Sequence, residues 1–277
     1  MTNPLANVRA VLFDAVGTLI RPHPPVVDVY YEAGRQFGSA LTRREVAARF
    51  VKALRRAQRR DLPLQVAAAV GNATPTPRAS SSSARAPRRF RRRPTNERKE
   101  RQRWRKIVSD VFGDSSAAKG PLFEHLWQHF AESRHWALYD DVADVWPLLK
   151  RRVPIVGVAS NFDCRLAQVC RGLAPLSRCR HVYTSSSVGW PKPSPRFFRA
   201  IASRLDLLPE QILLVGNDRV NDYLGARSAG WQALYLDREG KSPCKGKSER
   251  DGKSERDGKS ARGTISRLDA LLEVLAP

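Results

Sequence analysis

Short apolar runs mark five stretches of the chain as candidate strands. They cover residues 8–13, 153–159, 181–184, 211–216 and 232–236. Runs of this length, rich in Val, Leu and Ile and bounded by polar segments, are typical of buried strands. Helical patterns separate the later runs, which predicts a parallel sheet and an α/β fold.

Between the first two runs, residues 26–146 show helical periodicity and no convincing strand. Apolar side chains recur at helical spacing in one stripe of Trp104, Ile107, Val108 and Val111. A similar stripe follows, made of Leu122, Phe123, Leu126, Trp127 and Phe130. Both stripes predict an α-helical insertion into the sheet domain. A last apolar series predicts a closing helix that docks on the sheet, with Ile265, Leu268, Leu271, Leu272 and Leu275.

The charge distribution separates two tracts from this framework. The chain has 277 residues and a formal net charge of +22. Residues 74–93 carry seven arginines and no acid, and residues 241–262 carry eight basic and four acidic residues. Both tracts are low in complexity and unable to bury a core, so we expect disordered insertions over 71–94 and 240–262. The expected domains are a core of 1–22 and 147–277, with 23–146 inserted.

Cysteine usage and hydropathy narrow the class of protein. The four cysteines, at 164, 170, 179 and 244, form no Cys-x-x-Cys pair, so neither a disulfide framework nor a cysteine zinc site is indicated. No apolar run approaches the roughly 20 residues that span a bilayer, and residues 1–10 do not read as a secretory signal. We therefore expect a cytoplasmic protein that does not enter a membrane.

Two local patterns mimic functional motifs. Gly-Lys-Ser recurs from Gly240 onward, but five residues separate successive glycines where a phosphate-binding loop has four, and no apolar helix follows. His125 and His129 are four apart on a predicted helix, but they flank its apolar stripe and no Glu follows His125. We interpret the first as a solvated repeat and the second as a helix edge.

The candidate chemistry begins at Asp14, which follows the apolar run Val11-Leu12-Phe13 directly. In an open α/β sheet, ligands bind at the carboxyl ends of the strands, so Asp14 is a candidate nucleophile. The segment Phe13-Asp14-Ala15-Val16-Gly17-Thr18-Leu19 resembles the first motif of the haloacid dehalogenase-like (HAD) hydrolases. Three further segments match that family in order: Ser160-Asn161-Phe162-Asp163, Lys192-Pro193, and Gly216-Asn217-Asp218 with Asp222. The second motif with the residues after it, Ser160-Asn161-Phe162-Asp163-x-Arg165-Leu166, resembles more closely a subgroup of HAD-like hydrolase domain proteins that have helical caps.

The resemblance implies a Rossmann-like parallel-sheet core, with the insertion as an α-helical cap over the active site. It implies a Mg²⁺-dependent phosphatase that forms an aspartyl-phosphate on Asp14. Ser160, Asn161, Thr18 and Lys192 would bind the phosphoryl group of a small-molecule substrate, with Lys192 and Ser160 also assisting catalysis. The implied metal ligands are Asp14, the Val16 backbone carbonyl, Asp218, Asp222 and Asn217.

Two positions depart from the family pattern. Most of its phosphatases have an acid–base aspartate where this chain has Val16, and such a group is worth roughly 10²- to 10⁴-fold in rate. The fourth motif commonly reads Gly-Asp, whereas here Asn217 follows Gly216. Either Asn217 or Asp218 can fill the metal position, and fewer carboxylates would weaken Mg²⁺ binding.

Two alternatives stay open. Arg88-Arg89-Phe90-Arg91-Arg92-Arg93 would attract nucleic acid or another acidic partner to a catalytically impaired scaffold, although only Phe90 offers a stacking surface. This binding role is possible but not favoured. A metal-free 2-haloacid dehalogenase fits less well, because the family's dehalogenases usually have Tyr where this chain has Val16, and because Asp218 and Asp222 resemble metal ligands. The sequence determines neither the substrate nor the oligomeric state.

Overall fold

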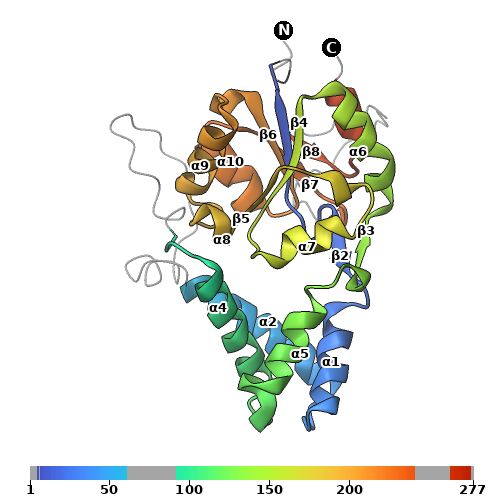
Figure 1. Cartoon of the computed structure of the whole chain (residues 1–277), viewed down its shortest axis with the longest axis vertical. Coiled ribbons are helices and arrows are strands. Elements are labelled where there is room, and N and C mark those ends of the chain that lie inside the picture. The colour runs from blue at the N-terminus through green and yellow to red at the C-terminus, as the bar shows by residue number, and fades with distance from the viewer. Residues whose placement is uncertain (1–4, 6, 61–91, 241–262, 276–277) are drawn as a thin grey trace, which may run out of the picture.

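A computed structural model describes residues 5, 7–60, 92–240 and 263–275 (Figure 1). Within these ranges the main sheet has the strand order β5-β4-β1-β6-β7-β8, and every neighbouring pair is parallel. Its strands are β1 Ala10–Phe13, β4 Ile155–Ser160, β5 Val182–Thr184, β6 Ile212–Gly216, β7 Gln232–Leu236 and β8 Thr264–Ile265. The five predicted strands are confirmed, each to within two residues at either end. The architecture is Rossmann-like α/β.

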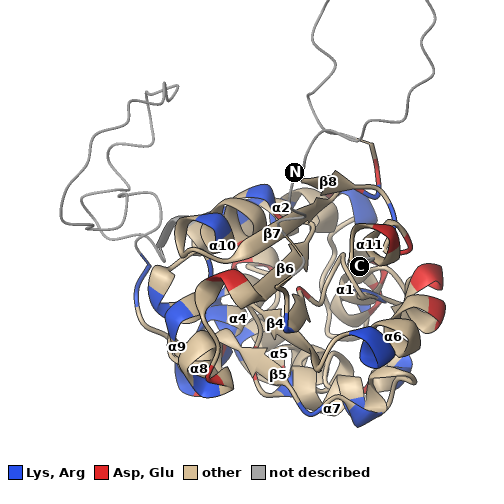
Figure 2. Cartoon of the chain, turned by 90° about the horizontal axis from the view of Figure 1, so that it is seen from above, with Lys and Arg blue, Asp and Glu red and all other residues tan. Residues whose placement is uncertain are grey.

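Apolar side chains alternate between the two faces of this sheet. Val11 and Phe13 of β1 belong to one buried cluster, whereas Ala10 and Leu12 belong to another. The first face is covered by α6 Asp140–Arg152, α7 Arg165–Arg171 and α11 Ala270–Val274. The opposite face is covered by α8 Ser185–Val188, α9 Pro195–Leu205 and α10 Gly225–Ser228. Figure 2 shows the two groups of helices on either side of the strands. Burial on both faces explains why the strands read as continuous apolar runs.

A helical bundle, made of α1, α2, α4 and α5, lies beyond the carboxyl ends of the strands (Figure 1). Its members are α1 Val26–Gln36, α2 Arg43–Arg60, α4 Glu97–Val111 and α5 Pro121–His129. The bundle has an apolar cluster of its own, which includes Tyr30, Phe112 and Phe123. Both predicted stripes contribute to this cluster, with Ile107, Val108 and Val111 from one and Leu122, Phe123 and Leu126 from the other.

The bundle joins the sheet domain through two antiparallel segments, β2 Ile20–Pro22 and β3 Trp136–Leu138. Short helical turns connect these elements within the described ranges; they are η2 Ser116–Lys119, η3 Ser133–His135, η4 Leu176–Arg178, η5 Pro209–Gln211 and the π-helical η6 Arg219–Leu224. Because β2 follows Asp14 closely, the chain leaves for the bundle directly from the candidate nucleophile. The bundle is thereby anchored beside that residue.

The structure differs from the sequence expectation at three places. The expectation of no strand in 26–146 is wrong, since β3 lies there; three residues are too few to show a period-2 pattern. Ile265 belongs to β8 and not to the closing helix, which is α11. The helix α6 begins at Asp140, within the range 23–146 that we expected to be inserted, yet it packs on the sheet.

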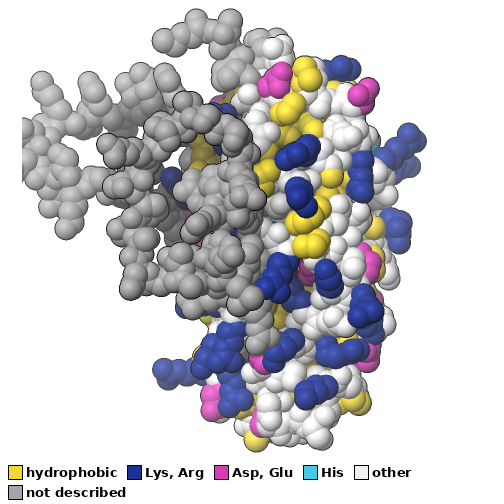
Figure 3. Space-filling model, turned by 90° about the vertical axis from the view of Figure 1, so that its left-hand side faces the viewer, with side chains coloured by type: hydrophobic (Ala, Val, Ile, Leu, Met, Phe, Trp, Pro, Cys, Tyr) yellow, Lys and Arg dark blue, Asp and Glu magenta, His cyan; other side chains and the backbone are white. Residues whose placement is uncertain are grey.

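The basic character of the chain is visible on its surface. Figure 3 shows Lys and Arg side chains spread over the described part of one face, with fewer acidic groups among them. The expected disordered insertions, 71–94 and 240–262, lie almost wholly outside the described residues. No helix in the described ranges has the length and hydropathy to cross a membrane.

A buried ion pair braces the turn that follows Asp14. The guanidinium of Arg238 donates from both terminal nitrogens to Asp141, at 2.9 Å each, and one of them also donates to the Thr18 carbonyl at 2.8 Å. The Leu268 amide donates to the same carboxylate at 2.8 Å. Burial alone would raise the pKa of Asp141, but the hydrogen bonds from Arg238 and Leu268 outweigh it and lower that pKa. The pair joins α6, the turn after β1, and the segment before α11.

We expect Asp141→Asn to lower the free energy of unfolding by about 3–5 kcal/mol near neutral pH, because it leaves Arg238 without its charge partner. Since folding lowers this pKa, the stabilisation is present above the ordinary value of 3.8 and is lost as the pH falls through the folded-state pKa. Urea titrations from neutral to acidic pH measure the difference. Asp144→Asn, on an exposed position of the same helix, is the control and should change little. A wild-type advantage that persists unchanged at the lowest pH would contradict this assignment.

Candidate active site

Asp14 lies at the centre of the sheet edge that faces the bundle. Its strand β1 is flanked by β4 and β6, and its amide donates to the Val215 carbonyl at 2.9 Å, which continues the sheet pairing by one residue. The side chain is 13% exposed. A carboxylate held by a central strand is thus presented at the carboxyl end of the sheet, where α/β folds bind ligands.

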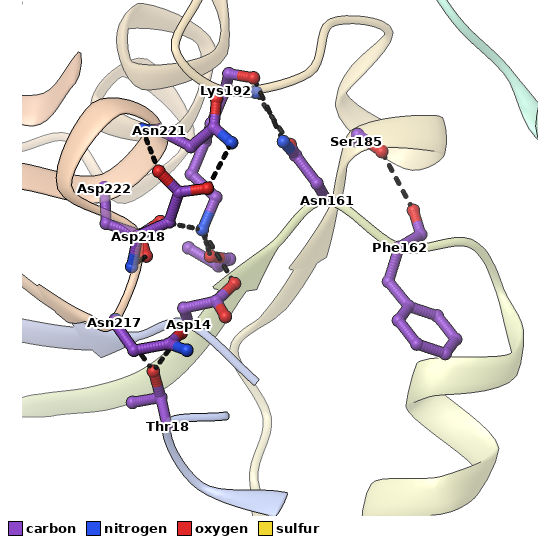
Figure 4. A network of polar contacts seen from close by, with 11 residues as sticks. Asp14, Thr18, Asn161, Phe162, Ser185, Lys192, Asn217, Asp218, Asn221 and Asp222 are labelled. Carbon is purple, nitrogen blue, oxygen red and sulfur yellow. Dashed lines mark hydrogen bonds and ion pairs between the residues drawn. The ribbon is translucent and has the colours of Figure 1, made fainter. Parts of the chain in front are cut away.

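Lys192 connects the segments that carry the acidic side chains. Its ammonium donates to Asp14 Oδ1 at 2.8 Å, to Asp222 Oδ1 at 2.6 Å and to the Ala159 carbonyl at 2.7 Å. These contacts account for all three N–H bonds of a lysine. Figure 4 shows the ammonium lying between the two carboxylates. Segments distant in sequence therefore converge on one buried cation.

The protonation of this cluster follows from its burial and its charges. Burial by itself lowers the pKa of Lys192, but the carboxylates of Asp14 and Asp222 outweigh that effect and raise it. Burial also raises the pKa of Asp222, to about 7, against the opposing pull of Lys192. The raised pKa of Lys192 and the three acceptors around its ammonium keep the lysine protonated at neutral pH, where Asp222 is near its own pKa. The site thus contains a fixed positive charge.

Asn161 holds the loop that carries Lys192. Its side-chain carbonyl accepts from the Lys192 amide at 2.7 Å, and its side-chain amide donates to the Lys192 carbonyl at 3.0 Å. Asn161 directly follows Ser160, the last residue of β4, so the strand end fixes the position of the lysine backbone. The Ser160 side chain is buried and lines the cavity described below.

The segment after β6 brings Asp222 back against the sheet. Its Oδ2 accepts from the Asp218 amide at 3.0 Å, and the side chain is almost fully buried. A Cβ on Gly216 would lie 2.2 Å from this oxygen. Only glycine permits such an approach, which explains the Gly at the end of β6.

Asp218 and Asn217 make different contacts. The Asp218 carboxylate accepts from the Val220 and Asn221 amides, at 2.9 and 2.8 Å, and from the Asn221 side chain at 2.7 Å. It therefore caps η6, the turn that carries Asp222. The Asn217 side-chain oxygen accepts from the Thr18 hydroxyl at 3.2 Å. The amide group of the same side chain packs against Gly17, whose φ of +85° suits glycine.

These residues surround a cavity of about 510 Å³. Among the predicted site residues, Asp14, Val16, Ser160, Asn161, Lys192, Asn217, Asp218 and Asp222 line it. Thr18 does not; it is fully buried and contacts Asn217 and Arg238 instead. The lining also includes residues that the motifs did not identify, among them Gln58, Arg92, Arg103 and Trp104. Arg103 and Trp104 come from α4 of the bundle, and Arg92 precedes it.

The donor set fits a hard divalent cation. Asp14, Asp222 and Asn217 line one cavity and carry oxygen atoms in their side chains, and Mg²⁺ prefers oxygen ligands with few carboxylates. Asp14, Asp218 and Asp222 do not meet within 4.8 Å of one another, because Asp218 is turned toward its own turn of helix. In the described ranges, the one group of three such ligands that does is Glu97, Asp163 and Cys164. His125 and His129 belong to no such group there.

The parallel sheet, with a strand-end aspartate, a buried lysine and a second aspartate at its edge, has the arrangement expected of the HAD-like fold. A family model described as haloacid dehalogenase-like hydrolase matches residues 8–230. The chain therefore belongs to the haloacid dehalogenase-like hydrolases.

Individual relatives are more distant. Human haloacid dehalogenase-like hydrolase domain-containing protein 3 is 31% identical over 140 residues, which cover 49% of this chain and 56% of that protein. Phosphoserine phosphatase of Thermus thermophilus is 28% identical over 136 residues, covering 48% and 54%. The chain thus spans a little over half the length of these curated relatives.

Solved structures share the fold over nearly the whole chain. A HAD phosphatase from Thermococcus onnurineus has a TM-score of 0.58 at 19% identity, with 97% of this chain and 98% of that chain covered. A 2-haloacid dehalogenase from Pseudomonas syringae also has a TM-score of 0.58, at 17% identity, with 97% and 98% covered. At such identities the likeness establishes the fold and not the reaction.

Lys192→Met should lower the free energy of unfolding by about 3–5 kcal/mol in EDTA, because two buried carboxylates lose their shared cation. Met matches the unbranched side chain, so packing changes little. The double variant Lys192→Met/Asp222→Asn should recover part of this loss, since one of the two uncompensated charges is gone. Urea unfolding of wild type, Lys192→Met, Asp222→Asn and the double variant measures the coupling energy between the two side chains. If the two substitutions are additive, the account of the cluster is wrong.

Proposed function

We propose that this protein is a Mg²⁺-dependent phosphatase that transfers the phosphoryl group of a small molecule to Asp14 and then to water. The observation that carries the proposal is the arrangement of Asp14, whose Oδ1 is held at 2.8 Å by a fully buried lysine while its carboxylate borders the cavity. Asp14 Oδ2 has no hydrogen-bond partner among the described residues. One oxygen is therefore oriented and the other can attack phosphorus.

The reaction follows from these positions. Asp14 Oδ2 forms a bond to phosphorus as the bond from phosphorus to the leaving oxygen breaks, which splits one difficult displacement into two easier ones. Water then attacks the phosphorus of the aspartyl-phosphate and restores the carboxylate. Lys192 contributes by orientation and by offsetting negative charge at the carboxylates.

Phosphoryl oxygens require donors and positive charge in the cavity. We assign these roles to the Ser160 hydroxyl, the Asn161 backbone and the guanidinium groups of Arg92 and Arg103. Ser160 ends a central strand and the arginines come from the bundle side, so a phosphoryl group would lie between the sheet and the bundle. In this role the bundle acts as a cap that contributes to substrate binding.

Asp14 and Asp222 are the carboxylates we assign to Mg²⁺, with neutral oxygens from Asn217 and the Val16 backbone. When bound, the cation would offset charge on the phosphoryl oxygens. Asp218 is better placed as the cap that positions Asp222, because three N–H groups donate to it. The sequence left Asn217 and Asp218 as alternatives. We assign Asn217, because one hydrogen bond, from Thr18, leaves its carbonyl oxygen a second lone pair for a cation.

The competing functions lack a supporting observation. The arginine tract proposed for nucleic-acid binding lies outside the described residues except for its last members, of which Arg92 lines the cavity. A metal-free dehalogenase is less favoured, because Asp222 lies with Asp14 at the same lysine and such a pair of carboxylates suits a divalent cation. Both features are accounted for by the phosphatase.

Asp14→Asn should reduce Mg²⁺-dependent hydrolysis of aryl phosphates by roughly 10³-fold or more, because the amide cannot replace the nucleophile. EDTA should abolish wild-type turnover, and added Mg²⁺ should restore it. Steady-state phosphate release measures both effects. The control is Asp206→Asn, the same substitution at the end of α9, away from the cavity. Full activity in Asp14→Asn, or in EDTA, would refute the corresponding part of the proposal.

A further inference from the structure

A second cavity, of about 430 Å³, lies on the bundle side of the 510 Å³ cavity that borders Asp14. We call the cavity at Asp14 the phosphoryl cavity and the second one the aromatic cavity. Its walls are largely aromatic and aliphatic. The aromatic members are Tyr30, Phe50, Trp104, Phe123, Trp127, Phe130, Trp136 and Phe162. A concave apolar site of this volume is of the size that binds small molecules.

The two cavities are adjacent and share part of their walls. Val16, Gln58, Trp104 and Asn161 line both. Asn161 also holds the backbone of Lys192, and Val16 lies two residues after Asp14. A molecule with its phosphoryl group at Asp14 would therefore extend past Val16 and Trp104 into the aromatic cavity.

The aromatic cavity carries no uncompensated charge among its described lining residues. Its one charged side chain there is Arg165, which donates to both oxygens of the buried Asp163 at 2.8 Å. The guanidinium also lies over the Trp127 ring, 3.5 Å from its centroid. The Asp163 carboxylate thus neutralises the charge of Arg165. The cavity therefore favours an apolar ligand with flat faces.

The phosphoryl cavity adds an independent constraint on the leaving group. Its described lining contains no His, Tyr or Cys, and Val16 cannot donate a proton. The N–H bonds of Lys192 are committed to three acceptors. Both Asp222 oxygens accept hydrogen bonds, from Lys192 and the Asp218 amide, and the Asp218 carboxylate is an acceptor in its cap. A leaving oxygen that departs as an anion therefore suits this site better than one that needs protonation. Phenols ionise near pH 10, far more readily than alkyl alcohols.

We propose that the preferred substrate is the phosphate monoester of a phenol, with its ring in the aromatic cavity. The inference rests on the proposed function, since it presumes phosphoryl transfer to Asp14. The phosphorus–oxygen bond breaks with its electron pair on the phenolate oxygen as the bond from Asp14 to phosphorus forms. The phenolate takes its proton from solvent, and water later releases inorganic phosphate and regenerates Asp14.

Three substrates distinguish the contribution of the aromatic ring to kcat/KM from the contribution of the leaving group. These are 2-naphthyl phosphate, which has both a ring and a good leaving group; acetyl phosphate, which has only the leaving group; and 2-naphthylmethyl phosphate, which has only the ring. We expect kcat/KM for 2-naphthyl phosphate to exceed that for each of the others by about 10-fold or more. Equal values for 2-naphthyl and acetyl phosphate would overturn the ring site, although the phosphatase would stand.

A substitution that fills the aromatic cavity tests whether the ring of the substrate binds there. Leu54, on α2, lines the aromatic cavity but not the phosphoryl cavity, whereas Val51 on the same helix is 46% exposed. Leu54→Trp should lower kcat/KM for 2-naphthyl phosphate by about 10- to 100-fold and leave acetyl phosphate within twofold. Val51→Trp is the matched control and should leave both unchanged. Equal losses on both substrates in Leu54→Trp would contradict the proposal.

Binding provides a readout that does not depend on turnover. Trp104, Trp127 and Trp136 line the cavity, so 2-naphthol should alter tryptophan fluorescence in wild type and in Val51→Trp, but at much higher concentration in Leu54→Trp. If no ester is hydrolysed, the proposed function fails; 2-naphthol binding that Leu54→Trp weakens would still support the ring site. Absence of binding in wild type would overturn it.

Discussion

The structure depends most on the ammonium of Lys192, which is fully buried at the edge of the sheet. Its three hydrogen bonds reach the end of β1, the end of β4 and the turn after β6, and each lies between 2.6 and 2.8 Å. A buried cation is costly unless it is paired and hydrogen-bonded, so the segments that surround it are constrained to meet. The same contacts orient Asp14. They also fix the positions of the charged groups at the cavity, which are the Lys192 ammonium and the carboxylates of Asp14 and Asp222.

The bundle provides what the sheet cannot. The sheet edge contributes charged and polar groups, while α1, α2, α4 and α5 contribute aromatic walls and the arginine at position 103. Val16 and Trp104 lie where the two contributions join. In the proposed reaction the sheet residues carry out the chemistry and the bundle residues surround the rest of the substrate, so we expect the bundle to determine substrate choice.

The sequence predicted the sheet well for a physical reason. Strands buried on both faces, such as β4 and β6, produce unbroken apolar runs, and the acidic residues just after them indicated the ligand edge. The short β2 and β3 gave no comparable pattern. Arg103 and Gln58 escaped notice because single polar residues on helices carry no local signal, and Arg92 was considered only as part of the arginine tract. The packing of the bundle over the sheet places all three at the cavity. Trp104 was assigned to a helical stripe and proved to line both cavities.

The central claim, that Asp14 is the nucleophile of a phosphoryl transfer, is tested most directly by trapping the covalent enzyme. A single turnover of 2-naphthyl phosphate labelled in its phosphoryl group would be quenched in acid within milliseconds to seconds, and peptides would be mapped by mass spectrometry. The account predicts transient label on the peptide containing Asp14 in wild type and none there in Asp14→Asn. Turnover without label at Asp14, or label on a different residue in both proteins, would contradict it.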